Sequence, residues 1–227
     1  GIGFAIAQSL TSAGAKVHIT STSERIFDRA KEIGASATIA DLTVESDCRR
    51  IVAELSTLDI LVNNAGVMDF MQGVGELSDD IWRRVMGINL EGPMFTMRRA
   101  VPLMVKQGGG SIIIIASIFG RESGGRMTYN AVKAAEISLA KSMSQQLARD
   151  NIRVNCVAPG VVRTAFHKHM TEETRRVNLE QRIPLHREGT PEQVAQQVAS
   201  VTGQYIKAVL AEGRSHAYAQ RGHGGQA

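Results

Sequence analysis

Apolar and polar residues follow each other along the chain in blocks that predict short buried strands separated by amphipathic helices. Runs rich in Val and Ile predict strands at 17–20, 37–40, 59–62, 111–116 and 153–158. Apolar residues at helical spacing predict helices at 2–13, 24–33, 44–55, 79–106, 127–149 and 190–200. Strand and helix in alternation predict an α/β fold, with a doubly wound parallel sheet that helices cover on both faces.

The pattern contains no internal repeat and no linker, which predicts a single domain over residues 1–204. Its last helix begins at Thr190, where Pro191 and Gln193 complete a capping box. Residues 205–227 lack a sustained apolar period and are predicted to form an irregular C-terminal tail.

Composition narrows the classes of protein that this chain can represent. The 43% hydrophobic and 21% charged residues are typical of a soluble globular protein, and the longest aliphatic run, Ile112–Ile115, is too short to cross a membrane. Two cysteines, Cys48 and Cys156, argue against a disulfide framework and indicate reduced thiols in a cytoplasmic protein. The net charge of +4 comes from scattered basic pairs, so no nucleic-acid partner is expected.

Candidate chemistry gathers directly after the predicted strands. In a parallel α/β sheet, ligands bind beyond the carboxyl ends of the strands. The polar residues at those positions are Thr20-Ser21-Thr22, Asp41, Asn63-Asn64-Ala65-Gly66, Ser117 and Pro159-Gly160.

Tyr129 and Lys133 are four positions apart on a predicted helix and therefore share one face. Alone, this spacing favours an ordinary amphipathic surface pair. Ser117 at the end of the central strand, Asn89 in the preceding long helix and the Asn63–Gly66 segment change that interpretation, because all belong to one edge of one sheet. Together they indicate a catalytic site.

These motifs, with Gly1-Ile2-Gly3, resemble the short-chain dehydrogenase/reductase (SDR) family from Gly1 to about Gln204. The resemblance implies a Rossmann-like fold and a catalytic set of Asn89, Ser117, Tyr129 and Lys133. Tyr129 is expected to donate a proton to the substrate oxygen, with its pKa lowered by the Lys133 ammonium. Ser117 is expected to hold that oxygen, and Asn89 to connect Lys133 to solvent through a bound water.

The resemblance also implies a nicotinamide cofactor. Its pyrophosphate is expected at Gly1, Ile2 and Gly3, where a helix begins. The further cofactor contacts expected are Asp41, Leu42, Asn63, Ala65, Gly66, Tyr129, Lys133, Pro159, Gly160, Val162 and Thr164. The alternative for Asp41 is a capping carboxylate before Thr43.

The residues after the strand at 17–20 favour NADP(H), with NAD as the alternative cofactor. Ser21 and Thr22 supply hydroxyl groups and Arg25 a guanidinium, a set that suits a 2′-phosphate better than a ribose diol.

The sequence departs from the family at both ends. The family's first strand, which lies between the strands at 17–20 and 59–62, is missing, and an empty slot there would leave two strand edges unpaired. We therefore expect the natural protein to extend further at its N-terminus. The acidic-glycine-glycine ending of the family is also absent, which puts the C-terminal strand in doubt.

The function predicted from the sequence is an NADP(H)-dependent oxidoreductase that transfers a hydride between nicotinamide and a carbonyl or secondary alcohol. Among family members the overall pattern most resembles 3-oxoacyl-acyl-carrier-protein reductases. The alternatives are a sugar or secondary-alcohol dehydrogenase and a non-catalytic nucleotide-binding homologue. The family implies a small-molecule substrate and a homo-oligomer, a dimer or tetramer. No metal site is expected, because His167 and His169 have no carboxylate cluster beside them and are interpreted as surface residues.

Overall fold

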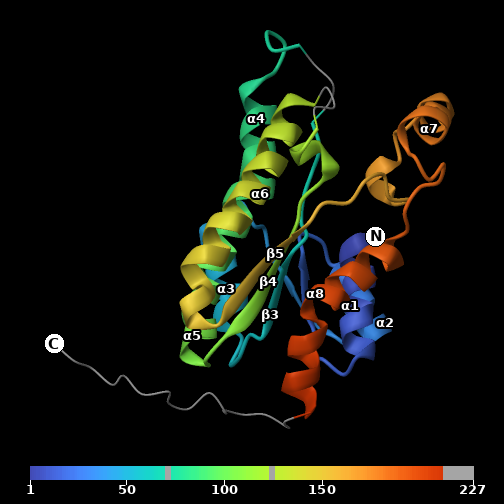
Figure 1. Ribbon diagram of the computed structural model, residues 1–227. Helices are drawn as coiled ribbons and strands as arrows, with labels where there is room; N and C mark the ends of the chain where they lie inside the picture. Colours follow the sequence, from blue (N-terminus) through green and yellow to red (C-terminus); the bar gives the residue numbers. More distant parts are fainter. Residues whose placement is uncertain (70–72, 123–125, 212–227) are drawn as a thin grey trace.

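The protein has an α/β fold in which helices cover both faces of parallel strands (Figure 1). The computed structural model describes residues 1–69, 73–122 and 126–211. In chain order the elements are α1 (Ile2–Ser12), β1 (His18–Ser21), α2 (Arg25–Ile33), β2 (Ser36–Ile39), α3 (Glu45–Ala53), β3 (Ile60–Asn63), α4 (Asp79–Met86), α5 (Gly92–Lys106), β4 (Gly110–Ile115), α6 (Met127–Leu147), β5 (Ile152–Val157), α7 (Glu172–Val177) and α8 (Pro191–Ala211). The predicted fold class is confirmed, and each predicted strand is present within one residue of its expected position.

The strands form two separate parallel sheets rather than one. β1 pairs with β2, and β3, β4 and β5 pair in that order. Within the described part of the chain, no strand pairs with the edges of β1 and β3 that face each other, and both edges line one cavity. The vacant slot predicted between these two strands is therefore present, and it explains why one predicted sheet is found as two.

The central strand β4 is buried along its whole length, which accounts for its four consecutive isoleucines. Ile113 and Ile115 face α1 and α8, whereas Ile112 and Ile114 face α5 and α6. Figure 1 shows these two helix pairs on opposite sides of the strands. Burial on both faces fixes the position of β4, and with it the residues that follow at its carboxyl end.

The C-terminal helix begins as the sequence predicts. The Thr190 hydroxyl accepts a hydrogen bond from the Gln193 N–H at 3.3 Å, and the Gln193 side-chain oxygen accepts one from the Thr190 N–H at 3.0 Å. This reciprocal pair is a capping box.

The same helix extends further than predicted. It continues to Ala211, so residues 205–211, expected to be irregular, are helical. The Ala, Leu and Lys residues of this segment favour a helix strongly enough to outweigh the preceding Gly203. Residues 212–227 of the predicted tail lie outside the described residues. No strand follows β5 in residues 126–211 of the structure.

The burial of β4 predicts a large effect of truncation at its centre. Ile113→Ala is expected to lower the free energy of unfolding by about 2–5 kcal/mol, because Ile113 is fully buried between α1 and α8. Val105→Ala, at a side chain that is 43% exposed, should change it by less than about 0.5 kcal/mol. Chemical denaturation of both variants checks this, and equal losses would contradict the assignment of β4 to the core.

Candidate functional site

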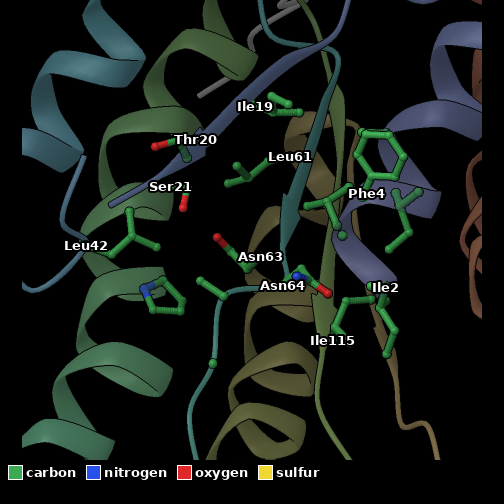
Figure 2. Close-up of a pocket in the computed structure, with 18 of the residues that line it drawn as sticks. Ile2, Phe4, Ile19, Thr20, Ser21, Leu42, Leu61, Asn63, Asn64 and Ile115 are labelled. Atoms are coloured by element: carbon green, nitrogen blue, oxygen red, sulfur yellow. The ribbon is translucent and has the colours of Figure 1, made fainter. Parts of the chain in front are cut away.

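A cavity of about 1550 Å³ lies at the carboxyl ends of the strands and runs back between β1 and β3. Figure 2 shows Thr20 and Ser21 of β1 across this cavity from Asn63 and Asn64, with Ile2 and Phe4 of α1 on the other side. All but three of the residues predicted to form the site line the cavity. The exceptions are Arg25, Asn89 and Lys133.

The N-terminus of α1 opens onto this cavity. Its first turn has no capping side chain, so backbone N–H groups of α1 remain available to a ligand. A Cβ atom on Gly1 would meet no atom within 4 Å, whereas one on Gly3 would come within 2.6 Å of the Asn64 side-chain nitrogen. Free N–H groups at the positive end of a helix dipole favour an anion such as a pyrophosphate.

The residues that follow β1 and β2 form the far end of the cavity. Ser21 and Thr22 line it, while Arg25 is exposed at the start of α2 and lies outside the lining. Arg29, one turn further along α2, does line the cavity, and its guanidinium lies 3.8 Å from the centre of the Phe4 ring. Sequence reasoning missed Arg29, although its spacing from Arg25 places both on one helix face.

Asp41 forms a local turn with Thr43 and does not cap a helix, the alternative predicted for it, because α3 begins at Glu45 with Val44 as its N-cap. One carboxylate oxygen of Asp41 accepts hydrogen bonds from the Thr43 N–H at 2.9 Å and the Thr43 hydroxyl at 2.7 Å. Asp41 and its neighbour Leu42 still line the cavity.

Asn63, at the end of β3, carries an unused hydrogen-bond donor. The residue is buried, and its side-chain nitrogen has no partner among the described residues. A buried amide without a partner costs free energy, so its position beside the cavity indicates that a bound molecule satisfies it.

Ser117 and Tyr129 meet at the end of β4. Ser117 follows the strand and caps the short turn Ile118–Gly120 by accepting from the Phe119 N–H at 3.2 Å. Tyr129 lies in the first turn of α6, is buried, and lies near enough to Ser117 for that side chain to lower its pKa. The rings of Phe119 and Phe166 lie on either side of it, with centroid distances of 6.3 and 6.2 Å. The hydroxyl groups of Ser117 and Tyr129 therefore line the cavity next to two aromatic side chains.

The pKa of Tyr129 shifts in the direction opposite to the one expected. Burial raises it to about 12, the Ser117 side chain opposes that rise, and the negative charge of Glu136 adds to it. The Lys133 nitrogen lies 5.5 Å from the Tyr129 ring centre, but its charge is balanced by a carboxylate. At neutral pH Tyr129 is therefore a phenol, able to donate a proton.

Lys133 is buried behind Tyr129 and makes two kinds of contact. Its ammonium donates to the Ile115 carbonyl oxygen at 3.1 Å and to both carboxylate oxygens of Glu136, at 2.9 and 3.0 Å. Burial raises the pKa of Glu136 to about 7, and the ion pair with Lys133 opposes that rise. Sequence reasoning missed Glu136, although a glutamate on the apolar face of a helix, one turn after Lys133, is itself a signal.

Asn89 connects this group to the loop after β3. It lies in a π-helical turn, Gly87–Glu91, between α4 and α5 and is fully buried. Its amide nitrogen donates to the Val67 and Val85 carbonyl oxygens, and its amide oxygen accepts from the Val67 N–H. A Cβ on Gly66 would lie 2.7 Å from the Asn89 oxygen and 3.6 Å from the Lys133 nitrogen. The side chains of Asn89 and Lys133 therefore both lie beside Gly66.

The loop after β5 completes the cavity wall. The Pro159 carbonyl oxygen accepts from the Ile118 N–H at 3.0 Å, and Val162 forms a parallel bridge with Gly189. Gly160, Val162 and Thr164 line the cavity, as does His167, which is partly buried rather than on the surface as expected. Among the residues that the structure describes, no group of three or more His, Cys, Asp or Glu side chains is arranged to hold a metal ion.

Comparison with known proteins places this geometry in a family. A family model described as Enoyl-(Acyl carrier protein) reductase matches residues 1–211. Dehydrogenase/reductase SDR family member 4 of Oryctolagus cuniculus is 35% identical over 207 residues, which cover 86% of this chain and 80% of that protein. The chain belongs to the short-chain dehydrogenase/reductase family. Carbonyl reductase family member 4 of Xenopus laevis is 37% identical over 205 residues, covering 87% of this chain and 85% of that protein.

A solved structure supports the same assignment. A short-chain type dehydrogenase/reductase from Mycobacterium ulcerans superposes with a TM-score of 0.83 and 26% identity, over 87% of this chain and 78% of that one. The protein is therefore an SDR oxidoreductase, and members of this family typically bind a nicotinamide cofactor. None of the helices in the described ranges is long and apolar enough to cross a membrane.

The cavity fits such a dinucleotide on structural grounds. The uncapped N-terminus of α1 can bind the pyrophosphate. The Asn63 side-chain nitrogen, which has no partner among the described residues, can donate a hydrogen bond to the dinucleotide. One cavity extends from the N-terminus of α1 and Asn63 to Ser117 and Tyr129. A dinucleotide bound there would span from the helix N-terminus to the two hydroxyl groups.

The tight approach at Gly66 generates a test of the site. Gly66→Ala should displace the Asn89 side chain, disturb the Val67 loop and lower kcat/KM by about 10- to 100-fold, because small displacements at a reacting centre have large effects. Gly75→Ala, where a Cβ meets nothing within 4 Å, is the matched control. Steady-state kinetics with thermal melting checks both, and full activity of Gly66→Ala would contradict this geometry.

Proposed function

We propose that this protein is an NADP(H)-dependent reductase of a small carbonyl compound, with 3-oxoacyl thioesters as the substrate class. The observation that carries the proposal is the pair of hydroxyl side chains, Ser117 and Tyr129, which both line the cavity where it meets the end of β4. A proton donor and a hydrogen-bonding hydroxyl at one point are what carbonyl reduction requires of the protein.

The proposed roles of the side chains follow from their positions. Ser117 holds the substrate carbonyl oxygen by a hydrogen bond, and the Tyr129 hydroxyl approaches the same oxygen. The nicotinamide, when bound, supplies the hydride that is added to the carbonyl carbon. Tyr129 gives its proton to the oxygen, which completes the alcohol, and the phenolate that remains takes a proton from solvent. Asn89 fixes the Val67 loop beside Lys133, where the proton path to solvent would run.

The residues around the far end of the cavity support NADP(H). Ser21 and Thr22 present hydroxyl groups, and Arg25 and Arg29 lie one turn apart on α2. A carboxylate that holds a ribose diol would disfavour a 2′-phosphate, and Glu24, the first acidic residue after β1, is absent from the cavity lining.

The substrate class rests on two kinds of support. The Xenopus laevis relative is named as a carbonyl reductase, and the matching family model is described in terms of an acyl-carrier-protein substrate. The reacting end of the cavity is flanked by the rings of Phe119 and Phe166, which suit an apolar chain attached to the carbonyl.

Removal of the proposed proton donor tests the reaction. Tyr129→Phe should lower kcat by about 10²–10⁴-fold, because the general acid is lost while the ring still packs between Phe119 and Phe166. The dissociation constant for NADPH, measured by fluorescence titration, should stay within about twofold of the wild-type value. Turnover of acetoacetyl thioesters, simple ketones and glucose with each cofactor separates the substrate classes. Wild-type turnover by the variant would refute the mechanism.

Cofactor preference has a test of its own. The KM for NADPH should be about tenfold or more below that for NADH, since a charge-assisted hydrogen bond to a phosphate contributes roughly 1.5–3 kcal/mol. Arg29→Ala, which removes the guanidinium that lines the cavity, should reduce the difference between the two KM values. Arg83→Ala, in an exposed ion pair on α4, should leave that difference unchanged. A lower KM for NADH would overturn the choice of cofactor.

A further inference from the structure

A buried carboxylate lies directly behind the proposed proton donor. The side chains of Lys133 and Glu136 are each only 3% exposed, and their charged groups are 2.9 Å apart. Both belong to α6, with Lys133 one turn and Glu136 two turns after Tyr129. The Lys133 ammonium is also bound to the Ile115 carbonyl of β4. Nothing in the proposed reaction uses Glu136.

Such a residue needs a physical reason. Burying a carboxylate costs free energy that an ion pair recovers only in part, and an apolar side chain of similar volume is often at least as stable. The Lys133 ammonium already has a backbone acceptor in Ile115. What Glu136 adds, beyond hydrogen bonds, is a negative charge in a region of low dielectric next to Tyr129.

Of the charged groups near Tyr129, Glu136 is the carboxylate that pairs with Lys133. On the remaining elements, Arg126 and Asp69 face Tyr129 with opposite signs, and Cys156 of β5 lies near Glu136. His167 follows Phe166, whose ring packs on Tyr129. The charged residues of the neighbouring α4 and π-helical turn, Asp79, Asp80, Arg83, Arg84 and Glu91, are all exposed.

We propose that Glu136 is a positioning residue that balances the charge of Lys133, keeps Tyr129 in its phenol form and thereby poises the site for carbonyl reduction. The inference rests on the proposed function, because it concerns which protonation state of Tyr129 meets the substrate. An uncompensated ammonium beside Tyr129 would favour the phenolate, which is the base that alcohol oxidation requires. Above about pH 7, where Glu136 is ionised, the pair is neutral overall and burial keeps Tyr129 a phenol.

Glu136 itself forms and breaks no bond in this account. During reduction the Tyr129 O–H bond breaks as the proton passes to the substrate oxygen, and a solvent proton restores it. Glu136 acts through Lys133, by holding the ammonium against the end of β4 and cancelling its field at Tyr129.

The test follows the ionisation of Tyr129 directly, without turnover. Full-length protein is labelled with tyrosine carrying ¹³C at Cζ, whose NMR shift reports phenol or phenolate. The chain has three tyrosines, so Tyr129→Phe assigns the signal. Titration across about pH 8 to 10.5 brackets the ordinary pKa of tyrosine. Tyr129 should remain a phenol throughout in the wild type, whereas in Glu136→Gln, with its pKa lowered by about one to three pH units, it should begin to ionise within this range.

Asp79→Asn is the matched control, because it removes one negative charge from an exposed ion pair on α4. It should leave the Tyr129 signal unchanged. In pH–rate profiles, Glu136→Gln should move the alkaline limb of reduction and the rising limb of oxidation to lower pH by the same shift.

Two results would overturn the proposal. One is a Tyr129 signal in Glu136→Gln that stays at the phenol position up to about pH 10.5, as in the wild type. The other is ionisation of Tyr129 below about pH 9 in the wild-type protein, a measurement that stands even if the variant fails to fold. Neither result depends on catalysis. An inactive enzyme would refute the proposed function, whereas the titration would still show whether Glu136 controls the ionisation of Tyr129.

Discussion

The hydrogen bond from Lys133 to the carbonyl oxygen of Ile115 ties helix α6 to the end of the central strand, and the geometry of the site depends on it. β4 cannot shift, because its isoleucines are packed from both faces. Attached to that fixed end, α6 presents Tyr129 to Ser117, which follows the same strand. A backbone acceptor at the carboxyl end of a parallel strand therefore determines where the hydroxyl groups meet.

Burial gives this arrangement its chemical character. Tyr129 lies between two aromatic rings, and its phenolate is disfavoured by removal from water. The Lys133–Glu136 pair brings two charges into the same region but little net charge. The spacing of Lys133 and Glu136 along α6 permits their ion pair, but only the tertiary structure shows that the pair is buried beside Tyr129.

The cavity combines two features of different origin. At the carboxyl ends of the strands it has the uncapped helix terminus and polar side chains of a dinucleotide site. Towards the interior it continues between the unpaired edges of β1 and β3. The outer part is therefore the part to compare with other SDR proteins, since the inner part reflects the vacant position between the two sheets.

The order of elements, the burial of β4 and the gathering of Asn63, Ser117 and Tyr129 at one edge could be predicted from the sequence, because periodicity and the direction of parallel strands are local properties. The prediction that residues 205–211 are irregular was wrong, because the helix continues through Gly203 to Ala211. A single glycine lowers helix propensity too little to end a helix among good helix formers. The direction of the Tyr129 pKa shift and the burial of the Lys133–Glu136 pair were decided only by the tertiary structure. Both depend on segments far apart in the chain that pack against α6, and electrostatic energy at such sites is set by distance and by the exclusion of water.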